Sequence, residues 1–214
     1  MEIREIRISY AITCNDEYEE LQTLYKTLKA HIRPEDEIVI QLDTTNGKPN
    51  HQVHSYCYEL AKLREITLVQ YALINDFGRF KNNLAQHCTG DFIFQIDADE
   101  IPNAQLINAL PDLLVDNPEV DVYVVPRINL VEGITQEHIK KWGWNQDKDG
   151  AINFPDYQWR IYRNNGTVTW KNKVHEVLVG HKQWAPLPAE EVYSLYHIKT
   201  IEKQEKQNDY YDTI

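Results

Sequence analysis

The first half of the chain alternates strand-like and helix-like segments, and this alternation constrains the fold more than any other feature. Apolar residues recur at every second position over residues 6–12 and then at helical spacing over residues 21–32. Further strand-like segments follow at residues 37–43, 66–73 and 91–97. Strands separated by helices of this length form right-handed β-α-β units. We therefore predict an α/β fold with a mixed, mainly parallel sheet flanked by helices.

The second half of the chain has a different pattern. After a helix at 103–116, we predict a strand over residues 120–131 and an irregular polar segment up to residue 156. Two strand-like segments then flank Asn164-Asn165-Gly166, a sequence typical of a hairpin turn. We expect one domain with two lobes, residues 1–119 and 120–214.

Composition excludes several classes of function. A net charge of -11 argues against nucleic-acid binding, which needs a basic surface. No apolar stretch reaches the roughly 18 residues of a membrane span, so we expect no integral membrane segment. The charged start is unlike a signal peptide, and three widely spaced cysteines favour a reducing compartment. These features predict a cytoplasmic protein and leave peripheral attachment at a membrane face open.

Three acidic residues, Asp97, Asp99 and Glu100, end the apolar strand at 91–97. Carboxylates this close repel one another, so either water screens an ordinary strand end or a cation binds there. Asp43 ends a neighbouring strand, where it is either a turn residue or part of the same site. The chain has no glycine-rich phosphate loop, so a divalent cation would have to compensate a phosphate ligand. We expect Glu100 to face the following helix and to shape or cap the turn.

Three segments resemble successive blocks of the family 2 glycosyltransferases: ISYAITCNDEYEEL, EIVIQLDTTNG and FKNNLAQHCTGDFIFQIDADEIP. These are inverting enzymes with the nucleotide-sugar-binding fold called GT-A. Lys81-Asn82 stands where the family usually has Arg-Asn, which keeps the charge but loses the bidentate fork. The later segments PDYQWRIYR, WKNKVHE and LYHIKTIEKQEKQNDYY are similar to the branch of lipopolysaccharide-core and lipooligosaccharide glucosyltransferases. The resemblance implies a GT-A fold with a smaller acceptor-side β lobe over residues 120–214.

The resemblance also implies roles for residues on the donor side. Asp43 would read the nucleobase, usually uracil, and Thr13 would line the same pocket. Lys81 would face the diphosphate or the sugar, and Asn82 beside it belongs to the same donor-binding set. The donor would be a UDP-sugar.

The same resemblance implies a metal site for Mn²⁺ or Mg²⁺. Asp97 would lie near the ribose and the metal, Asp99 would bind the metal directly, and His197 would complete the site. A metal there would stabilise the negative charge that develops on the leaving diphosphate.

Two carboxylates compete for the role of catalytic base that an inverting transfer needs. Glu176, after His175, is the first candidate, and Asp156 is the second. The alternatives are that Asp156 only starts a strand and that His175 is structural. Arg160 pairs with a site carboxylate, or both Arg160 and Arg163 are surface charges.

These features predict a metal-dependent inverting transfer of a hexose from a UDP-sugar to a hydroxyl of a glycan or glycoconjugate. Trp142, Trp144 and Tyr157 form an acceptor-binding loop or fill the core under a long loop. Two other functions stay open: a sugar-phosphate nucleotidyltransferase, which normally has a glycine-rich phosphate loop, and a nucleotide-sugar-binding module without catalysis.

Overall fold

A seven-stranded sheet forms the centre of the molecule. The structure, a computed structural model, describes residues 5–211, apart from the side chains of residues 207 and 209–211. The sheet order is β11-β6-β8-β4-β1-β2-β3, and β8 runs antiparallel to both of its neighbours. The other strand pairs of this sheet are parallel, which confirms the predicted mixed, mainly parallel sheet. The strands are β1 (Ile8–Cys14), β2 (Glu37–Asp43), β3 (Thr67–Tyr71), β4 (Phe92–Asp97), β6 (Val122–Val125), β8 (Gln158–Arg163) and β11 (Trp184–Pro186).

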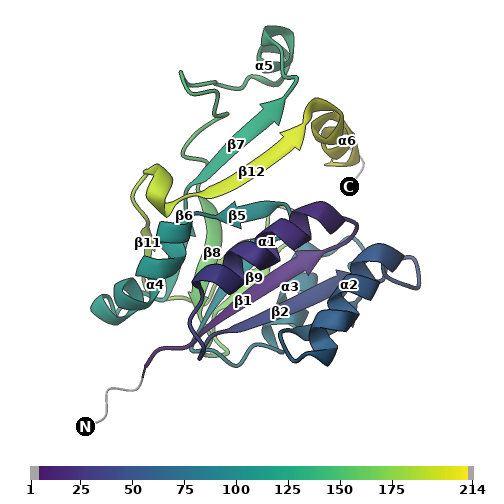
Figure 1. Cartoon of the computed structure of the whole chain (residues 1–214). Coiled ribbons are helices and arrows are strands. Elements are labelled where there is room, and N and C mark those ends of the chain that lie inside the picture. The colour runs from purple at the N-terminus through teal and green to yellow at the C-terminus, as the bar shows by residue number, and fades with distance from the viewer. Residues whose placement is uncertain (1–4, 212–214) are drawn as a thin grey trace.

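Both faces of this sheet are covered, as the nearly continuous apolar sequence of its central strands requires. One core packs α1 (Tyr18–His31), α2 (His51–Lys62) and α4 (Ala104–Asp116) against one face. The other core packs α3 (Phe77–Ala85) and the hairpin of β9 (Thr169–Lys171) and β10 (Val177–Val179) against the opposite face. Figure 1 shows α1 and α2 in front of the sheet and α3 behind it.

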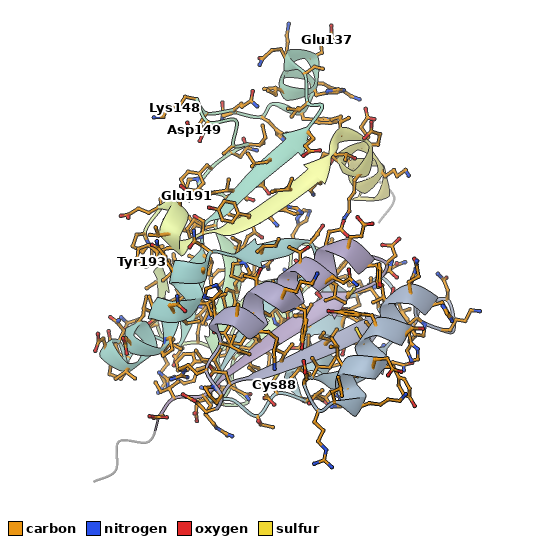
Figure 2. All side chains as sticks on the ribbon, in the orientation of Figure 1. Cys88, Glu137, Lys148, Asp149, Glu191 and Tyr193 are labelled. Atoms are coloured by element: carbon orange, nitrogen blue, oxygen red, sulfur yellow. The ribbon has the colours of Figure 1, made fainter. Side chains whose placement is uncertain are left out.

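A second sheet of three strands projects from the end of β4. Its order is β5-β12-β7, with β5 (Glu100–Pro102) antiparallel and β7 (Arg127–Glu132) parallel to the central strand β12 (Leu195–Thr200). Helices α5 (Gln136–Trp142) and α6 (Ile201–Tyr211) lie at its outer end, and a 3-10 turn precedes β12 (Figure 1). Glu137 on α5 and Lys148 and Asp149 on the following loop project there, far from the main sheet (Figure 2). No helix in residues 5–211 combines the length and apolar character needed to cross a bilayer.

Pro126 divides the predicted strand 120–131 into β6 of the main sheet and β7 of the small one. Proline has no backbone N–H, so it interrupts a strand ladder. Its carbonyl oxygen instead accepts from the backbone N–H of Leu195 (2.9 Å), at the start of β12. The division places the residues after Pro126 beside the carboxyl ends of the main sheet.

The predicted hairpin around Asn164-Asn165-Gly166 is wrong. β8 pairs with β4 and β6, whereas β9 pairs with β10. The side chain of Asn165 accepts from the backbone N–H of Thr167 (2.9 Å) and of Val168 (3.2 Å), so the turn leads the chain out of the sheet. The irregular segment before residue 156 also contains the short helix α5, which the sequence did not indicate.

Candidate active site

A cleft of about 860 Å³ lies between the carboxyl ends of β1, β2 and β4 and the three-stranded sheet. Every predicted site residue except Asn82 lines it. These residues are Thr13, Asp43, Lys81, Asp97, Asp99, Asp156, Glu176 and His197. Carboxyl ends of parallel strands meet at one edge of a sheet, and ligands of open α/β sheets bind there. The cleft is therefore the candidate active site.

Asp97 is held by side chains from three other elements. Its Oδ1 accepts from the hydroxyl of Thr13 (2.8 Å), and its Oδ2 accepts from Nη2 of Arg160 (2.8 Å). Lys81 Nζ lies 3.8 Å from Oδ1. Burial alone would raise the pKa of Asp97, but the charges of Lys81 and Arg160 lower it to about 2. The carboxylate is therefore ionised and directed at cations of the protein itself.

Glu100 is completely buried and faces two arginines rather than the following helix, but it does shape the turn, because its Oε2 accepts from the backbone N–H of Asp97 (3.3 Å). Its two oxygens accept from Arg160 Nη2 (2.7 Å), Arg160 Nε (2.9 Å) and Arg127 Nη1 (2.9 Å). The cap of α4 is Asn103, whose side chain accepts from the backbone N–H of Gln105. The buried guanidinium group of Arg160 and the half-buried one of Arg127 need a carboxylate between them, and Glu100 supplies it. Of the two alternatives for Arg160, pairing with site carboxylates is confirmed.

Asp99 and His197 form a pair across the start of the small sheet. His197 Nε2 lies 3.3 Å from Asp99 Oδ2, and His197 Nδ1 lies 2.9 Å from Oδ1 of Asn129. The amide of Asn129 is oriented by its Nδ2, which donates to Asp156 Oδ2 (2.7 Å). An amide oxygen only accepts, so Nδ1 of His197 carries the hydrogen. In the neutral ring, Nε2 then presents a lone pair toward Asp99, and a cation or a proton must lie between the two groups.

The spacing of Asp99 and His197, rather than the charge around them, is compatible with a cation site. Burial would raise the pKa of Asp99, but the bond to His197 and the nearby charges of Lys203 and Lys199 hold it below the ordinary value. Two ligands at right angles on one octahedral Mg²⁺ lie about 3 Å apart, close to the 3.3 Å between Asp99 and His197. Within residues 5–211 no group of three or more His, Cys, Asp or Glu side chains is arranged to hold a metal ion. The pair could therefore supply at most two of the ligands that a metal ion needs.

The second base candidate, Asp156, is fully engaged by the protein. Its Oδ2 accepts from Arg127 Nε (2.9 Å) and Asn129 Nδ2 (2.7 Å), and its Oδ1 accepts from Gln158 Nε2 (3.0 Å). Burial would raise the pKa of Asp156, but the charge of Arg127 and these bonds lower it. Asp156 is thus a weak acceptor for a further proton.

The first base candidate, Glu176, lies in the turn between β9 and β10. One carboxylate oxygen, Oε1, accepts from Lys81 Nζ at 2.5 Å. Among the described residues, Oε2 has no hydrogen-bond partner, and the side chain is 15% exposed. The ammonium of Lys81 also lies 4.8 Å from the centre of the Trp170 ring. Glu176 therefore has one oxygen fixed and one available to a ligand.

Asp43 uses only one of its oxygens within the protein. Its Oδ1 accepts from the backbone N–H groups of Thr45 (2.8 Å) and Leu73 (3.0 Å) and from the Thr45 hydroxyl (2.6 Å). In the part of the chain that the structure describes, Oδ2 has no partner. Both alternatives for Asp43 are thus compatible with the structure: it shapes the turn and still offers an oxygen to the cleft.

Asn82 lies on the far side of α3, in a neighbouring depression. Its Nδ2 donates to the carbonyl of Trp170 (2.8 Å), and its Oδ1 accepts from the backbone N–H of Trp170 (2.9 Å). These two hydrogen bonds join α3 to β9. The structure thus gives Asn82 a structural contact and separates it from the other predicted residues.

Several cleft residues escaped sequence reasoning, chiefly Arg127, Asn129 and Lys199. Lys199 is buried, and burial lowers its pKa to about 8 although Asp99 raises it. The signal that could have found these residues is the period of two in a strand, which puts Lys199 on the same face as His197. The pairing of β7 with β12 then aligns Asn129 with His197.

The aromatic residues of the long loop lie outside the core. Neither hydrophobic core of the described residues includes Trp142, Trp144 or Tyr157, so the core alternative is wrong for all three. Trp142 and Trp144 pack together with ring centres 4.7 Å apart, and Trp144 lines the cleft. Tyr157 is 39% exposed and donates to the carbonyl of Leu187. An aromatic acceptor-side wall is thus compatible with Trp144.

No protein-family model matches the sequence, and no curated protein matches it. Solved structures do share the fold. S. aureus TarS 1-349 superimposes with a TM-score of 0.62 and 13% identity, over 90% of this chain and 60% of that chain. Its complex with UDP-GlcNAc superimposes with a TM-score of 0.61 and 14% identity, over 91% of this chain and 59% of that chain. A longer S. aureus TarS structure superimposes with a TM-score of 0.60 and 13% identity, over 95% of this chain and 38% of that chain.

This chain spans about three-fifths of the length of the TarS 1-349 structures. The sequence identity is too low to establish more than the fold. That fold is the nucleotide-sugar glycosyltransferase fold of GT-A type, and it confirms the predicted fold class.

Proposed function

We propose that the protein is a metal-dependent inverting glycosyltransferase that moves a hexose from a UDP-sugar to a hydroxyl of a glycan or glycoconjugate. Support for a nucleotide-sugar donor comes from the fold, which is shared with TarS structures solved with UDP and with UDP-GlcNAc. The sequence resemblance favours family 2 and its lipopolysaccharide-core branch. The three cysteines, all free and buried, fit the cytoplasm.

The observation that carries the proposal is the charge of the cleft. Its lining contains six carboxylates, namely Glu17, Asp43, Asp97, Asp99, Asp156 and Glu176, and four Lys or Arg residues, namely Lys81, Arg127, Arg160 and Lys199. A diphosphate would add further negative charge to this surplus. A divalent cation offsets it, and carboxylate and phosphate oxygens are the ligands that Mg²⁺ and Mn²⁺ prefer.

Within this proposal, Asp99 and His197 hold the metal. The 3.3 Å spacing of the pair and the fixed tautomer of His197 fit that role. When bound, the metal stabilises the negative charge of the leaving nucleoside diphosphate. Asp97 is not a direct ligand in this reading, because Arg160 and Thr13 occupy its oxygens. Its role is to hold Arg160 and Lys81 beside the diphosphate.

The donor and the acceptor are assigned to different halves of one domain. Asp43 offers its Oδ2 to the nucleobase, and Thr13 lines the donor side, so residues 1–119 form most of the nucleotide-sugar lobe. Residues 120–214 supply the acceptor side with Trp144 and Glu176. Lys81 connects the two sides, since its Nζ contacts Glu176 and lies 3.8 Å from Asp97.

Glu176 is the proposed base, because protein donors bind both oxygens of Asp156, whereas Oε2 of Glu176 has no partner among the described residues. The Glu176 carboxylate takes the proton of the acceptor hydroxyl as that oxygen attacks the anomeric carbon. The bond between this carbon and the phosphate oxygen breaks on the opposite side, and the diphosphate leaves with the bonding electrons. Attack from the opposite side inverts the anomeric configuration.

The test is turnover of a UDP-hexose panel with Mn²⁺ and with EDTA, with the product anomer read by NMR. We expect metal-dependent release of UDP and inversion. Pyrophosphate release from UTP and a sugar phosphate would replace the proposal with a nucleotidyltransferase. UDP-sugar binding in calorimetry without turnover for any acceptor would replace it with a binding module.

A further inference from the structure

A second depression, of about 730 Å³, lies between α3 and the end of β9. Only a thin wall separates it from the cleft. In this wall the backbone N–H groups of Phe77 and Gly78 donate to the carbonyls of Lys173 (2.9 Å) and Asn172 (3.2 Å). Phe77 lines the cleft and Gly78 lines the depression. The two cavities therefore adjoin.

The depression carries an excess of positive charge on a chain whose net charge is -11. Arg79, Lys171 and Lys173 line it, and Asp76 is the single acid in its described lining. In the part of the chain that the structure describes, none of these three cations lies within 4 Å of a carboxylate oxygen of an acidic side chain. Most of the cleft's cations, by contrast, are ion-paired, as Lys81, Arg127 and Arg160 show. The charge of the depression is thus available to a ligand.

Tyr71 holds the guanidinium group of Arg79 in place at this depression. Its Nε donates to the hydroxyl of Tyr71 (2.8 Å), and its guanidinium carbon lies 5.4 Å from the centre of the Tyr71 ring. The two terminal nitrogens form a planar fork that matches the two oxygens of a carboxylate or phosphate. Because the group is already ordered, binding costs little side-chain entropy.

The rest of the lining suits a carbohydrate better than a lipid surface. The amides of Asn83 and Gln86 and the ring of Tyr71 supply the hydrogen-bonding and aromatic groups that sugars use. None of the exposed large apolar side chains of the described residues lines the depression. A membrane-binding face would instead need apolar groups to insert.

We propose that this depression binds an anionic segment of the acceptor glycan, whose units carry carboxylate or phosphate groups. The inference rests on the proposed function and names the class of its acceptor. The acceptor end occupies the cleft beside Glu176, and the chain continues over the turn at residues 172–175 into the depression.

The test compares two oligosaccharides of equal length, oligogalacturonate, which carries carboxylates, and the neutral maltopentaose. Calorimetry on the full chain measures each of them, and UDP in parallel. The charge-reversal variant is Lys171→Glu with Lys173→Glu. Its matched control is Lys26→Glu with Lys29→Glu, two exposed lysines on α1, which covers the opposite face of the sheet.

We expect oligogalacturonate to bind more tightly than maltopentaose and to weaken with salt. The Lys171 and Lys173 variant should lose about tenfold or more in this affinity, while the control variant keeps it. Arg79→Lys should also weaken binding, because lysine lacks the fork. Equal binding of both oligosaccharides, no binding, or no effect of charge reversal would overturn the proposal. So would binding confined to phosphatidylglycerol vesicles.

UDP affinity separates this inference from the proposed function. The Lys171 and Lys173 variant should bind UDP as the unmodified protein does, since neither residue lines the cleft. If the unmodified protein does not bind UDP, the proposed function is refuted, regardless of its affinity for the oligosaccharides.

Discussion

Substitution of Glu100 by glutamine tests the buried charge network beneath the cleft. Glu100 is 0% exposed and accepts four hydrogen bonds, two from Arg160, one from Arg127 and one from the backbone N–H of Asp97. Glutamine keeps the size but removes the charge and turns an N–H₂ group toward the guanidinium groups. Breaking a buried ion pair costs about 4 kcal/mol of unfolding free energy. For a chain of this length that lowers the melting temperature by about 12 °C.

The pH dependence of this effect follows from the direction of the pKa shift. Burial would raise the pKa of Glu100, but the charges of Arg160 and Arg127 hold it below the ordinary value. A carboxylate whose folded-state pKa is lowered stabilises the fold above its unfolded pKa of about 4.3. That contribution is lost as the pH falls through the folded pKa. The gap between the unmodified protein and Glu100→Gln should therefore be full at pH 7 and shrink below about pH 4.

The assay is urea and thermal unfolding, with Glu59→Gln as the control. Glu59 makes an exposed pair with Lys62, and its loss should leave the stability nearly unchanged. A double-mutant cycle with Arg160→Gln should show coupling of about 1–3 kcal/mol. A loss below about 1 kcal/mol for Glu100→Gln, or additive effects in the cycle, would refute the network argument.

Three further substitutions test the site. Asp99→Asn should lower Mn²⁺-stimulated transfer by about a hundredfold or more with an unchanged circular dichroism spectrum; activity like that of the unmodified protein would contradict the metal site. Glu176→Gln should lower kcat by about 10²-fold or more with UDP affinity kept, because only the base is lost; a larger loss in Asp156→Asn would exchange the two roles. Asn82→Ala should cost about 2 kcal/mol in urea unfolding, since two hydrogen bonds to Trp170 are lost; weaker UDP binding at unchanged stability would make Asn82 a donor ligand instead.

The sequence was sufficient to predict which acidic residues at the ends of β2 and β4 line the cleft. Asp43 and Asp97 each end an apolar strand, Asp99 follows two residues after β4, and parallel strands separated by helices bring their ends to one edge. Each of these features is local, so periodicity alone could place it. The same reasoning failed for the hairpin at residues 164–166, because β8 finds its partners in β4 and β6 rather than in the next strand.

The position of Asn82 depends on a close approach that no local pattern indicates. A Cβ atom at Gly78 would lie 2.5 Å from the carbonyl oxygen of Asn172, so only glycine lets α3 come this near to the end of β9. That approach allows Asn82 to reach the backbone of Trp170, 88 residues away in sequence. Asn82 therefore lines the depression on the far side of α3, although the preceding residue, Lys81, lines the cleft.

The acid triplet at the end of β4 shows why the remaining roles needed the fold. Asp97, Asp99 and Glu100 look alike in sequence, yet their sets of partners differ: Asp97 meets Arg160, Asp99 meets His197, and Glu100 meets Arg160 together with Arg127. These partners lie 27 to 98 residues away in the sequence. The break at Pro126 and the pairing of β12 with β7 bring Arg127 and His197 to the triplet. A buried carboxylate becomes a structural counterion when cations surround it, and a ligand when an acceptor faces it. The chemistry of the triplet is thus set by β7, β8 and β12, whereas the sequence of β4 alone left open whether water or a cation compensates these charges.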